Sequence, residues 1–528
     1  MSDALPLSNR ALKRLGLPPP HAYLPPPGPF YDPELYPDGI INLSIAENSL
    51  LSARLIEHLS RPLNSLRPQH LRYRATLIKT DLPTVEDLLP EYINDHFNPR
   101  IRVTRENSVA GPGIGACLAQ LCLLVHLLPL NSACVPPCAC EITALLRSVQ
   151  ATFLSGLGPR TKLYATDDYV RDITHPSGAT LVMADVPASI NSLSPDVLPI
   201  LDARLRASAQ GLGIQITALL IPNPHNPLPQ VVQREVIEGY ARLAEKYNIH
   251  LIVDEVYALS TYDSAYPPEI NEPFESVLTY DLPALGVDPS RVHVLAGPTK
   301  DFGASGLKLG LLISPHNIPL MNLIRPLFNA TPISSLSDVA FARVLQDKPF
   351  VEKFLADNRA LLRESYEITA EWLMWHGLEF TRANAAVYVV VNFEPFLARI
   401  APKNADAIEK LDAGVAALIR QRVFIKPTNL MADPVPTRFR LIFSQPRETL
   451  LLALRRIERA FDAPQAPLPT SAAVCAKAKA SLNGAKVVVN GWGHVNGHGV
   501  NGNEVKRNGN GVVNGHGDAS LKYLDDSD

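Results

Sequence analysis

The sequence has few of the features that mark secreted, membrane or nucleic-acid-binding proteins. Six cysteines in 528 residues are too few for a disulfide scaffold. The 49 lysines and arginines do not exceed the 52 aspartates and glutamates, so no basic surplus argues for nucleic acid. No apolar signal core follows a basic start. The most apolar run, 118–130, is shorter than the ~20 residues that span a bilayer. We therefore expect an intracellular, by default cytoplasmic, protein without nucleic-acid or membrane partners.

A metal site is not predicted either. Cys134, Cys138 and Cys140 form a cluster, but no second pair stands at ligand spacing and no histidine is near. We interpret them as buried thiols. Histidines 494, 498 and 516 lie in a segment of repeated Asn-Gly pairs with few large apolar residues. Such a segment cannot bury enough surface to offset its ordering entropy, so residues 466–528 are predicted to be a disordered Asn/Gly-rich tail with solvated histidines.

The middle of the chain alternates short apolar runs with a helical pattern. Residues 217–221, 250–253 and 292–296 read as buried strands, and 230–247 carry apolar residues at helical spacing. Strand, helix and strand in this order predict an α/β fold with a parallel sheet and crossover helices. Hydrophobic residues make up 46% of the chain, which is ample for a large core.

Polar segments follow those strands, at the edge where such sheets bind ligands. They are Asn223-Pro-His-Asn-Pro227, Asp254-Glu-Val-Tyr257 and Gly297-Pro-Thr-Lys-Asp-Phe-Gly303. The Lys300 amine can form a Schiff base with the aldehyde of pyridoxal phosphate. Asp254 can keep the pyridine nitrogen protonated, and Tyr257 and Asn226 can hydrogen-bond the phenolic oxygen. Alone, a lysine is usually a solvated surface residue and an aspartate a helix cap or salt-bridge partner. Their combined order predicts a pyridoxal-phosphate site.

These segments resemble the fold-type-I pyridoxal-phosphate enzymes. More narrowly, they are similar to the 1-aminocyclopropane-1-carboxylate synthase-like branch of the class I/II aminotransferases. Other segments share the likeness: Gly39-Ile-Ile-Asn-Leu-Ser-Ile-Ala-Glu-Asn48, Gly306, and Phe439-Arg-Leu-Ile-Phe443. The resemblance covers most of residues 30–462. It implies a large domain with a mostly parallel central sheet flanked by helices, plus a smaller α+β C-terminal domain.

The resemblance also implies a division of the chain and roles for further residues. Residues 1–30 are expected to form a Pro-rich arm, 31–100 to contribute to the small domain and active site, 101–325 to form the cofactor domain, and 326–465 the small domain. Arg440 would clamp the substrate α-carboxylate, for which a bidentate guanidinium is suited. Glu47 would be a substrate-side acid. In a homodimer, Tyr73 would reach the phosphate of the neighbouring subunit.

A glycine-rich turn, Ala110-Gly-Pro-Gly-Ile-Gly115, precedes a long apolar helix that we expect to begin near residue 116. Free backbone N–H groups and the positive end of the dipole suit phosphate there. The resemblance places the phosphate over Gly113 and Ile114. Thr299 adds a hydroxyl and Lys308 a cation on the same side.

Two positions depart from the family pattern. Lys308 stands where the family carries arginine; lysine neutralises phosphate as a point charge but lacks the planar fork. We therefore expect weaker cofactor retention rather than lost chemistry. The family's cofactor-stacking aromatic is missing from Val135-Pro-Pro-Cys-Ala-Cys-Glu141. Either Tyr164 or Tyr169 replaces it after an insertion, or stacking is absent.

The predicted chemistry begins with an amino acid that binds through Arg440 and displaces Lys300 from the cofactor. The freed lysine amine then takes the Cα proton. Transamination, in specialised metabolism, is the favoured outcome because it is the commonest chemistry on this scaffold. A carbon–sulfur lyase is the second hypothesis and an aminocyclopropane-carboxylate synthase the third.

A non-catalytic binding protein of the same fold is the hypothesis from a different class. Lys308 and the missing aromatic favour it. The retained lysine, aspartate, tyrosine, asparagine and arginine of the predicted site argue against it.

Overall fold

The computed structural model describes most of the chain between its two ends. The described residues are 25–63, 68–71, 83–127, 151–155, 180–184, 186, 190–211, 215–428, 433 and 435–468. The chain divides into the units 1–491 and 492–528, and every described residue belongs to the first. Tyr73, Tyr164, Tyr169, the cysteine cluster at 134–140, most of the Pro-rich arm and nearly all of the predicted tail lie outside these ranges.

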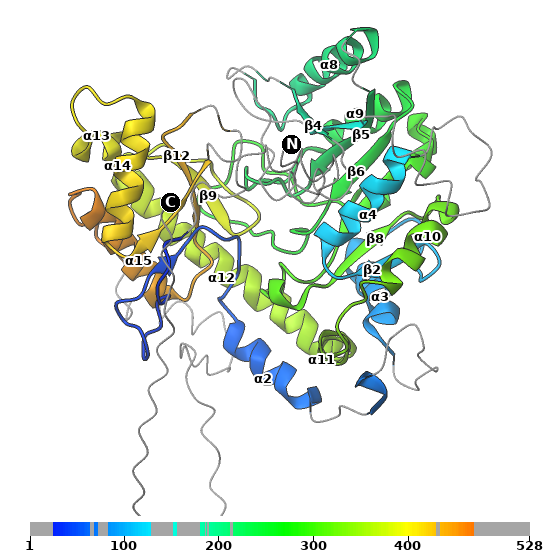
Figure 1. The fold of residues 1–528 in the computed structure, drawn as a ribbon, viewed down its shortest axis with the longest axis horizontal. Coiled ribbons are helices and arrows are strands. Elements are labelled where there is room, and N and C mark those ends of the chain that lie inside the picture. The colour runs from blue at the N-terminus through cyan, green and yellow to red at the C-terminus, as the bar shows by residue number, and fades with distance from the viewer. Residues whose placement is uncertain are drawn as a thin grey trace, which may run out of the picture. The chain divides into compact units, whose positions relative to one another are not determined.

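A seven-stranded sheet forms the centre of the larger part (Figure 1). Its order is β2-β8-β7-β6-β5-β3-β4, and the strands from β7 to β4 run parallel, whereas β8 is antiparallel to both β2 and β7. This confirms the predicted α/β fold with a mostly parallel sheet. The bounds are Ser108–Gly111 (β2), Gly310–Ile313 (β8), Val292–Ala296 (β7), His250–Asp254 (β6), Gln215–Pro222 (β5), Ala151–Ser155 (β3) and Thr180–Met183 (β4).

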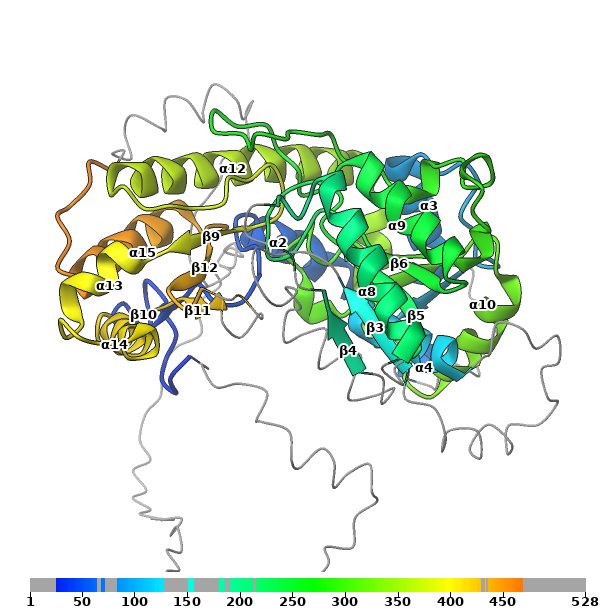
Figure 2. The same ribbon diagram turned by 90° about the horizontal axis from the view of Figure 1, so that it is seen from above.

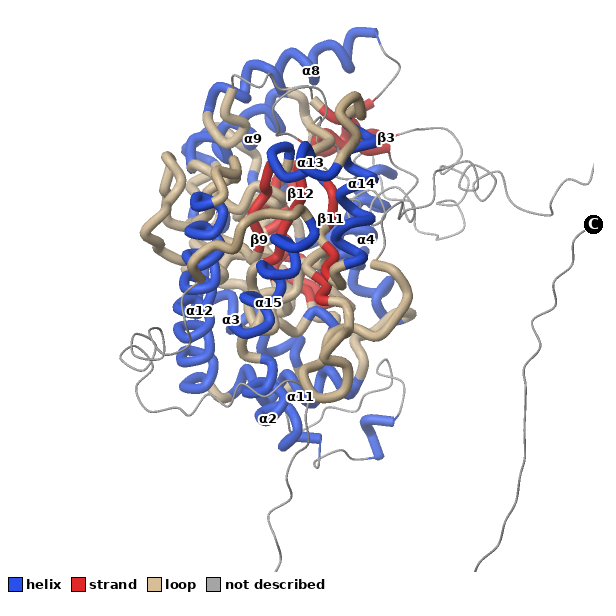
Figure 3. The backbone as a smooth tube through the Cα atoms, turned by 90° about the vertical axis from the view of Figure 1, so that its left-hand side faces the viewer, coloured by secondary structure: helices blue, strands red, loops and turns tan. Residues whose placement is uncertain are grey.

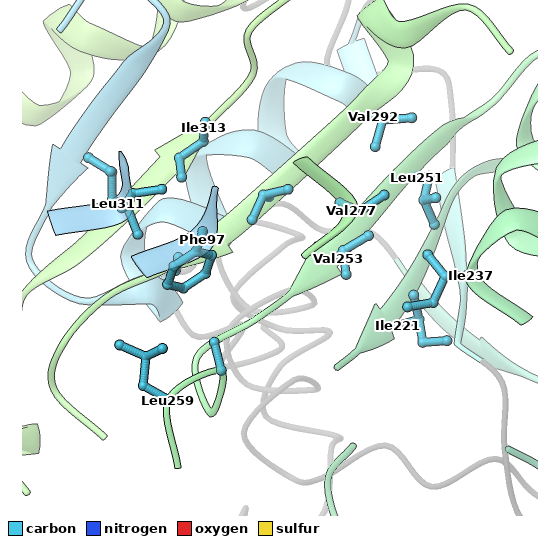
Figure 4. Packing of buried hydrophobic residues seen from close by; sticks show 14 of the residues in the cluster. Phe97, Ile221, Ile237, Leu251, Val253, Leu259, Val277, Val292, Leu311 and Ile313 are labelled. Carbon is cyan, nitrogen blue, oxygen red and sulfur yellow. The ribbon is translucent and has the colours of Figure 1, made fainter. Parts of the chain in front are cut away.

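Helices cover both faces of this sheet, which is why its central strands are buried throughout and mostly apolar. Every residue of β6 and β7 is buried. One face packs against α4 (Ile114–Leu127) and α10 (Ile318–Ile324). The other face forms a larger core with α3 (Val85–Phe97), α8 (Leu198–Gly211), α9 (Arg234–Lys246) and α11 (Ser335–Gln346). Figure 4 shows part of this core, where Ile237 of α9 lies beside Ile221 and Leu251.

The predicted helix over 230–247 begins late, at Arg234. The main-chain N–H groups of Val231 and Val232 donate instead to the side-chain oxygens of Asn384 and Asn223. Periodicity cannot reveal these partners, since Asn384 lies more than 150 positions away. Helix α4, in contrast, begins earlier than predicted: it starts at Ile114, two residues before the expected start.

Antiparallel strands and helices build a second core (Figure 2). Its three-stranded sheet has the order β11-β12-β9, and β1 pairs with β10 separately. The strands are Ile41–Asn42 (β1), Tyr388–Asn392 (β9), Val423–Phe424 (β10), Lys426–Pro427 (β11) and Arg438–Ile442 (β12). The helices are Glu394–Ile400 (α13), Ala407–Arg420 (α14) and Arg447–Ala460 (α15). Strand β9 begins only at Tyr388, because Ala385 and Ala386 donate their N–H groups to the carbonyls of Pro229 and Ser260 outside the sheet.

The longest helix, α12 (Lys348–Trp375), belongs to both cores. Val351, Phe354 and Leu355 pack in the first core, while Leu362 and Trp372 pack in the second. Helix α2 (Ser52–Leu63) packs against α11, and in Figure 3 both lie near one end of α12. Within the described ranges, no helix combines the length and apolarity needed to cross a bilayer. The predicted domain boundaries stay a prediction.

Candidate active site

Asp254 is the last residue of β6 and is 3% exposed. Its Oδ1 accepts the N–H of Val256 at 3.2 Å. Its main-chain carbonyl accepts the N–H of Asn223 at 2.8 Å, so the turn after β5 lies directly beside the turn after β6. Strand β7 pairs on the other side, through Leu295. The three polar segments predicted from the sequence therefore follow neighbouring strands at the same sheet edge.

The two carboxylates of Asp254-Glu255 have different surroundings. Glu255 accepts the hydroxyl of Ser276 at 2.6 Å and the N–H of Val277 at 2.8 Å. Burial raises the pKa of Glu255 to about 8, against the lowering effect of these two hydrogen bonds. Glu255 thus holds the 276–277 segment against the sheet, which leaves Asp254 as the buried carboxylate for the predicted pyridine contact.

Lys300 lies four residues beyond β7 and is half-buried. Its Nζ atom donates to the main-chain carbonyl of Ala46 at 2.7 Å and lies 5.9 Å from the centroid of the Tyr257 ring. Gly303 completes the same turn with a φ of +64°. A Cβ at Gly303 would stand 2.0 Å from the carbonyl oxygen of Asn48, so glycine is required for this close approach. Residues 46–48 therefore lie against residues 300–303, which we call the lysine turn.

Arg440, on β12, is 3% exposed and reaches the Asn226 turn. Its NH1 donates to Asn226 Oδ1 at 3.2 Å, and its NH2 donates to the carbonyl of Ser44 at 3.0 Å. Its Nε is buried and has no hydrogen-bond partner in the part of the chain that the structure describes. An unsatisfied guanidinium donor in a buried place suits an anionic ligand such as a carboxylate.

Tyr388 is a site residue that the sequence analysis missed. Its ring lies 5.1 Å from the Arg440 guanidinium and meets the Tyr257 ring edge-to-face at 5.8 Å. Its hydroxyl donates to the carbonyl of His225 at 3.2 Å. Burial raises the pKa of Tyr388 well above its usual range, so the phenol is neutral. No spacing in the sequence connected residue 388 with Tyr257 or Arg440.

His225, between the two asparagines of its turn, is also buried. Its Nδ1 accepts the N–H of Leu228 at 3.3 Å. Burial lowers the pKa of His225 to about 3, so the ring is neutral. It serves the turn that carries Asn226 rather than an acid–base step.

The glycine turn and Lys308 come together at the start of α4. Gly113 has a φ of +91°, and a Cβ there would stand 3.7 Å from Cδ of Lys308. Gly310 permits the same approach, because a Cβ on it would stand 2.5 Å from the amide nitrogen of Ile114. Lys308 is exposed, and Thr299 is buried. A helix N-terminus beside a lysine fits a phosphate group.

Glu47 is exposed, and its main-chain carbonyl accepts the Ser444 hydroxyl at 2.8 Å. Tyr73, Tyr164 and Tyr169 fall outside the described residues.

The donor set as a whole fits pyridoxal phosphate. A lysine amine, a buried carboxylate and a tyrosine follow neighbouring strands, the buried guanidinium of Arg440 has an unused donor, and a helix N-terminus with Lys308 is available for phosphate. The assignment of each residue to its part of the cofactor stays a prediction.

Comparison with known proteins agrees with this chemistry. The family profile described as "Aminotransferase class I and II" matches residues 186–457. A relative from Aspergillus oryzae, "Probable aminotransferase aclI", is 33% identical over 371 residues, which is 69% of this chain and 76% of the relative. The "1-aminocyclopropane-1-carboxylate synthase-like protein 1" of Bos taurus is 25% identical, over 82% of this chain and 78% of its own.

A solved structure, the aspartate aminotransferase of Thermus thermophilus with maleate, superimposes with a TM-score of 0.56 at 18% identity. The match covers 80% of this chain and 92% of that one. At this identity the likeness concerns the fold alone, and it agrees with the mostly parallel sheet flanked by helices.

Proposed function

The chain belongs to the class I and II aminotransferases, and from this premise we propose that it transfers the amino group of an amino acid to a keto acid, with Lys300 as the reactive lysine. Enzymes of this family depend on pyridoxal phosphate, and this chain is therefore a pyridoxal-phosphate enzyme. The substrate and the roles of individual residues are the proposed part.

One observation carries the proposal: an amine and a guanidinium stand at the two ends of a short row of aromatic rings. Lys300 Nζ lies 5.9 Å from the Tyr257 ring, and the Tyr257 and Tyr388 rings are 5.8 Å apart. The Arg440 guanidinium lies 5.1 Å from the Tyr388 ring. The two cations are thus separated by apolar ring faces, an arrangement suited to a small molecule with a carboxylate near one end and a reacting carbon near the other.

The roles follow from the chemistry of each group. Arg440 binds the α-carboxylate and orients the amino acid, because a guanidinium can donate two parallel hydrogen bonds. The Lys300 amine would take the proton from Cα as general base and, as general acid, deliver it to a neighbouring carbon rather than back to Cα. Bound pyridoxal phosphate supplies the electron sink that makes this proton removable. Asp254 would hold the pyridine nitrogen protonated, with Tyr257 and Asn226 at the phenolic oxygen.

The remaining assignments concern the phosphate and the rim of the site. Gly113, Ile114, Thr299 and Lys308 would hold the phosphate through N–H groups, a hydroxyl and a charge. Glu47, which is exposed, would face the substrate from the rim.

A product assay with a panel of amino acids tests the proposal. The full chain, loaded with pyridoxal phosphate, is incubated with each amino acid and a keto-acid acceptor. Amino transfer yields a new amino acid and a new keto acid in equal amounts without ammonia. Pyruvate, ammonia and a free thiol would instead show carbon–sulfur lyase action, and a cyclic amino acid would show ring closure. Free cofactor catalyses some of this chemistry, so Lys300→Ala is the control. No product from any amino acid would support the non-catalytic hypothesis.

We also propose that the protein is a homodimer, as the family resemblance implies. Several large apolar side chains of the described part are exposed, among them Leu35 at 68% and Leu71 at 88%. A second copy of the chain that covered such side chains would remove apolar surface from water. Light scattering on the protein as it elutes from a size-exclusion column distinguishes a monomer near 57.6 kDa from a dimer of twice that mass. The predicted contact of Tyr73 with the partner's phosphate depends on this result.

A further inference from the structure

One buried amide on α12 connects two segments of the proposed site. Asn358 is 1% exposed. Its Oδ1 accepts a hydrogen bond from Asn48 Nδ2 at 2.7 Å, and its Nδ2 donates to the main-chain carbonyl of Asp301 at 3.1 Å. Asn48 precedes Asn358 by 310 positions, and Asp301 follows the proposed reactive lysine directly. A single side chain therefore bridges the N-terminal segment and the lysine turn.

The N-terminal segment, residues 44–48, supplies acceptors to both proposed functional cations. The carbonyl of Ala46 accepts from Lys300, and the carbonyl of Ser44 accepts from Arg440. Both acceptors are main-chain atoms, so their positions depend on where the segment as a whole lies. Substitution of the side chains at 44 and 46 cannot remove them. Whatever holds the segment against residues 300–303 therefore also sets the relative placement of the amine and the guanidinium.

The bridge has one chemically consistent orientation. Asn48 Oδ1 accepts the N–H of Leu50 at 3.1 Å, which leaves the Asn48 amide nitrogen to face Asn358. Asn358 must then present its oxygen to Asn48 and its nitrogen to the carbonyl of Asp301. Aspartate could accept from Asn48 but would place a second oxygen against that carbonyl. Only an amide satisfies both sides in this space.

The lysine turn is fixed from other directions as well. Asp301 accepts the hydroxyl of Ser260 at 2.7 Å through its side chain, which joins it to the turn that carries Tyr257. Next to Asn358 on the helix, Asp357 forms an ion pair with Arg54 of α2. Asn358 is the member of this set that contacts both the N-terminal segment and the lysine turn.

We propose that Asn358 is a positioning residue that holds segment 44–48 on the lysine turn and so sets the placement of Lys300 relative to Arg440. The inference deepens the proposed function and rests on it for its catalytic consequence. The mechanical part, that the amide holds the segment, does not depend on any reaction.

The test uses the full chain with Asn358→Ala, Asn358→Asp and, from the other side of the same bond, Asn48→Ala. Thr369→Val is the matched control: Thr369 is a fully buried polar residue on the same helix, and among the described residues its hydroxyl donates only to the Ser365 carbonyl one turn earlier. Hydrogen–deuterium exchange is followed in a peptide that covers residues 43–48, with and without added pyridoxal phosphate; this range leaves out the Leu50 N–H, which Asn48→Ala would free directly.

The proposal expects exchange in this peptide to be about tenfold faster in all three bridge variants and unchanged in Thr369→Val. In the loaded enzyme, it expects kcat/KM per folded molecule to fall about tenfold, with a higher KM for the amino acid, since the Arg440 clamp is displaced. The Asn48→Ala and Asn358→Ala effects should not add, because they remove the same bond.

Unchanged exchange, additive effects, or a lower melting temperature with unaltered KM and kcat would each overturn the proposal and leave Asn358 a stabilising core residue. Asn48 lies in a loop, so the Asn48→Ala variant still tests the bridge if the variants of α12 fail to fold. A wild-type protein without any transfer activity would sink the proposed function, while the exchange measurement would still decide the bridge.

Discussion

The amine of Lys300 donates a hydrogen bond to the main-chain carbonyl of Ala46 at 2.7 Å, across 254 positions of sequence. The same N-terminal segment accepts from Arg440 through Ser44. A neutral carbonyl can hold the amine in place without adding a permanent charge beside it. The proposed reactive lysine and the proposed carboxylate clamp therefore share one mechanical support, and the predictions below depend on these two cations and their surroundings.

Replacement of Lys300 by alanine should abolish amino transfer, because no other amine of the described residues is placed beside Tyr257. Loss of a positioned general base alone lowers rates by roughly 10²–10⁴-fold. Keto-acid formation under saturating amino acid is the measurement. Lys246→Ala is the control, since Lys246 is an exposed lysine of α9 paired with Asp202. Activity of Lys300→Ala equal to that of the control would remove the lysine from the mechanism.

Arg440→Lys should raise KM for the amino acid by about 10–100-fold and affect kcat less. A lysine keeps the charge but cannot reproduce the planar fork, and one charge-assisted hydrogen bond is worth roughly 1.5–3 kcal/mol. Initial rates over a range of amino-acid concentrations measure both constants. Arg438→Lys, two residues earlier on β12 and partly exposed, is the matched control. Equal KM values in the two variants would contradict the clamp.

Lys308→Arg should tighten binding of pyridoxal phosphate about tenfold, the equivalent of ~1.4 kcal/mol. Arginine adds a second, parallel hydrogen bond to a phosphate oxygen. Lys308 adopts a φ of +53°, and its exposed side chain leaves room for the larger group. Fluorescence titration of the cofactor-free protein gives the Kd. A looser complex in Lys308→Arg, with Lys246→Arg unchanged, would mean that the phosphate site is shaped around lysine.

The contribution of Glu255 to the free energy of unfolding should decrease as pH rises from about 4.5 to about 8. Burial raises the pKa of Glu255 to about 8 and that of Asp301 to about 7. Between the unfolded and folded pKa values, the folded state binds more protons than the unfolded state, so stability is lost with increasing pH. Urea unfolding at several pH values measures this. Glu255→Gln, which keeps a neutral side chain of the same shape, should flatten the dependence, whereas the exposed Glu235→Gln should not.

Buried histidines act in the opposite direction at lower pH. Burial lowers the pKa of His225 to about 3 and that of His250 to about 4. The unfolded chain takes up protons on these rings below about pH 6.5 while the folded chain does not, so stability falls as pH decreases. The two effects oppose each other between about pH 4.5 and 6.5, so the unfolding free energy should fall most steeply with pH between about 6.5 and 8, where only the acids act. A stability that rises between pH 6.5 and 8 would contradict the assignment of the acids, and a stability that does not fall between pH 4 and pH 3 would contradict that of His225.

Tyr388→Phe should destabilise the protein by about 1 kcal/mol, because the carbonyl of His225 loses its hydrogen bond from the tyrosine hydroxyl. The ring remains between Tyr257 and Arg440, so kcat/KM per folded molecule should change less than about threefold. Tyr388→Ala removes the ring as well and should lower kcat/KM by at least tenfold. Urea midpoints and initial rates distinguish the two variants; equal kinetic losses would show that the hydroxyl, not the ring, matters.

Much of the fold followed from local sequence patterns. The strand at 292–296 has the predicted bounds, because a continuous apolar run directly reflects the burial of the whole strand. Asp254, which ends β6, and Lys300, four residues beyond β7, could be singled out for a related reason: polar residues after a buried strand lie at the sheet edge where ligands bind.

Contacts between distant segments determined features that the local sequence pattern could not predict. Tyr388 belongs to the site because its ring packs against Tyr257 on a different segment. Val231 and Val232 are not part of α9 because their N–H groups donate to Asn384 and Asn223 instead. Asn358 shows the same limit, since nothing in its own helix distinguishes it from any other buried amide. Hydrogen bonds and ring contacts between distant segments depend on how the two cores pack, whereas periodicity reports only which side of an element is buried. The sequence therefore determined which reactive groups follow the strands, namely the lysine amine, the carboxylate and the guanidinium. The packing of α12 and residues 44–48 determined where these groups lie relative to one another.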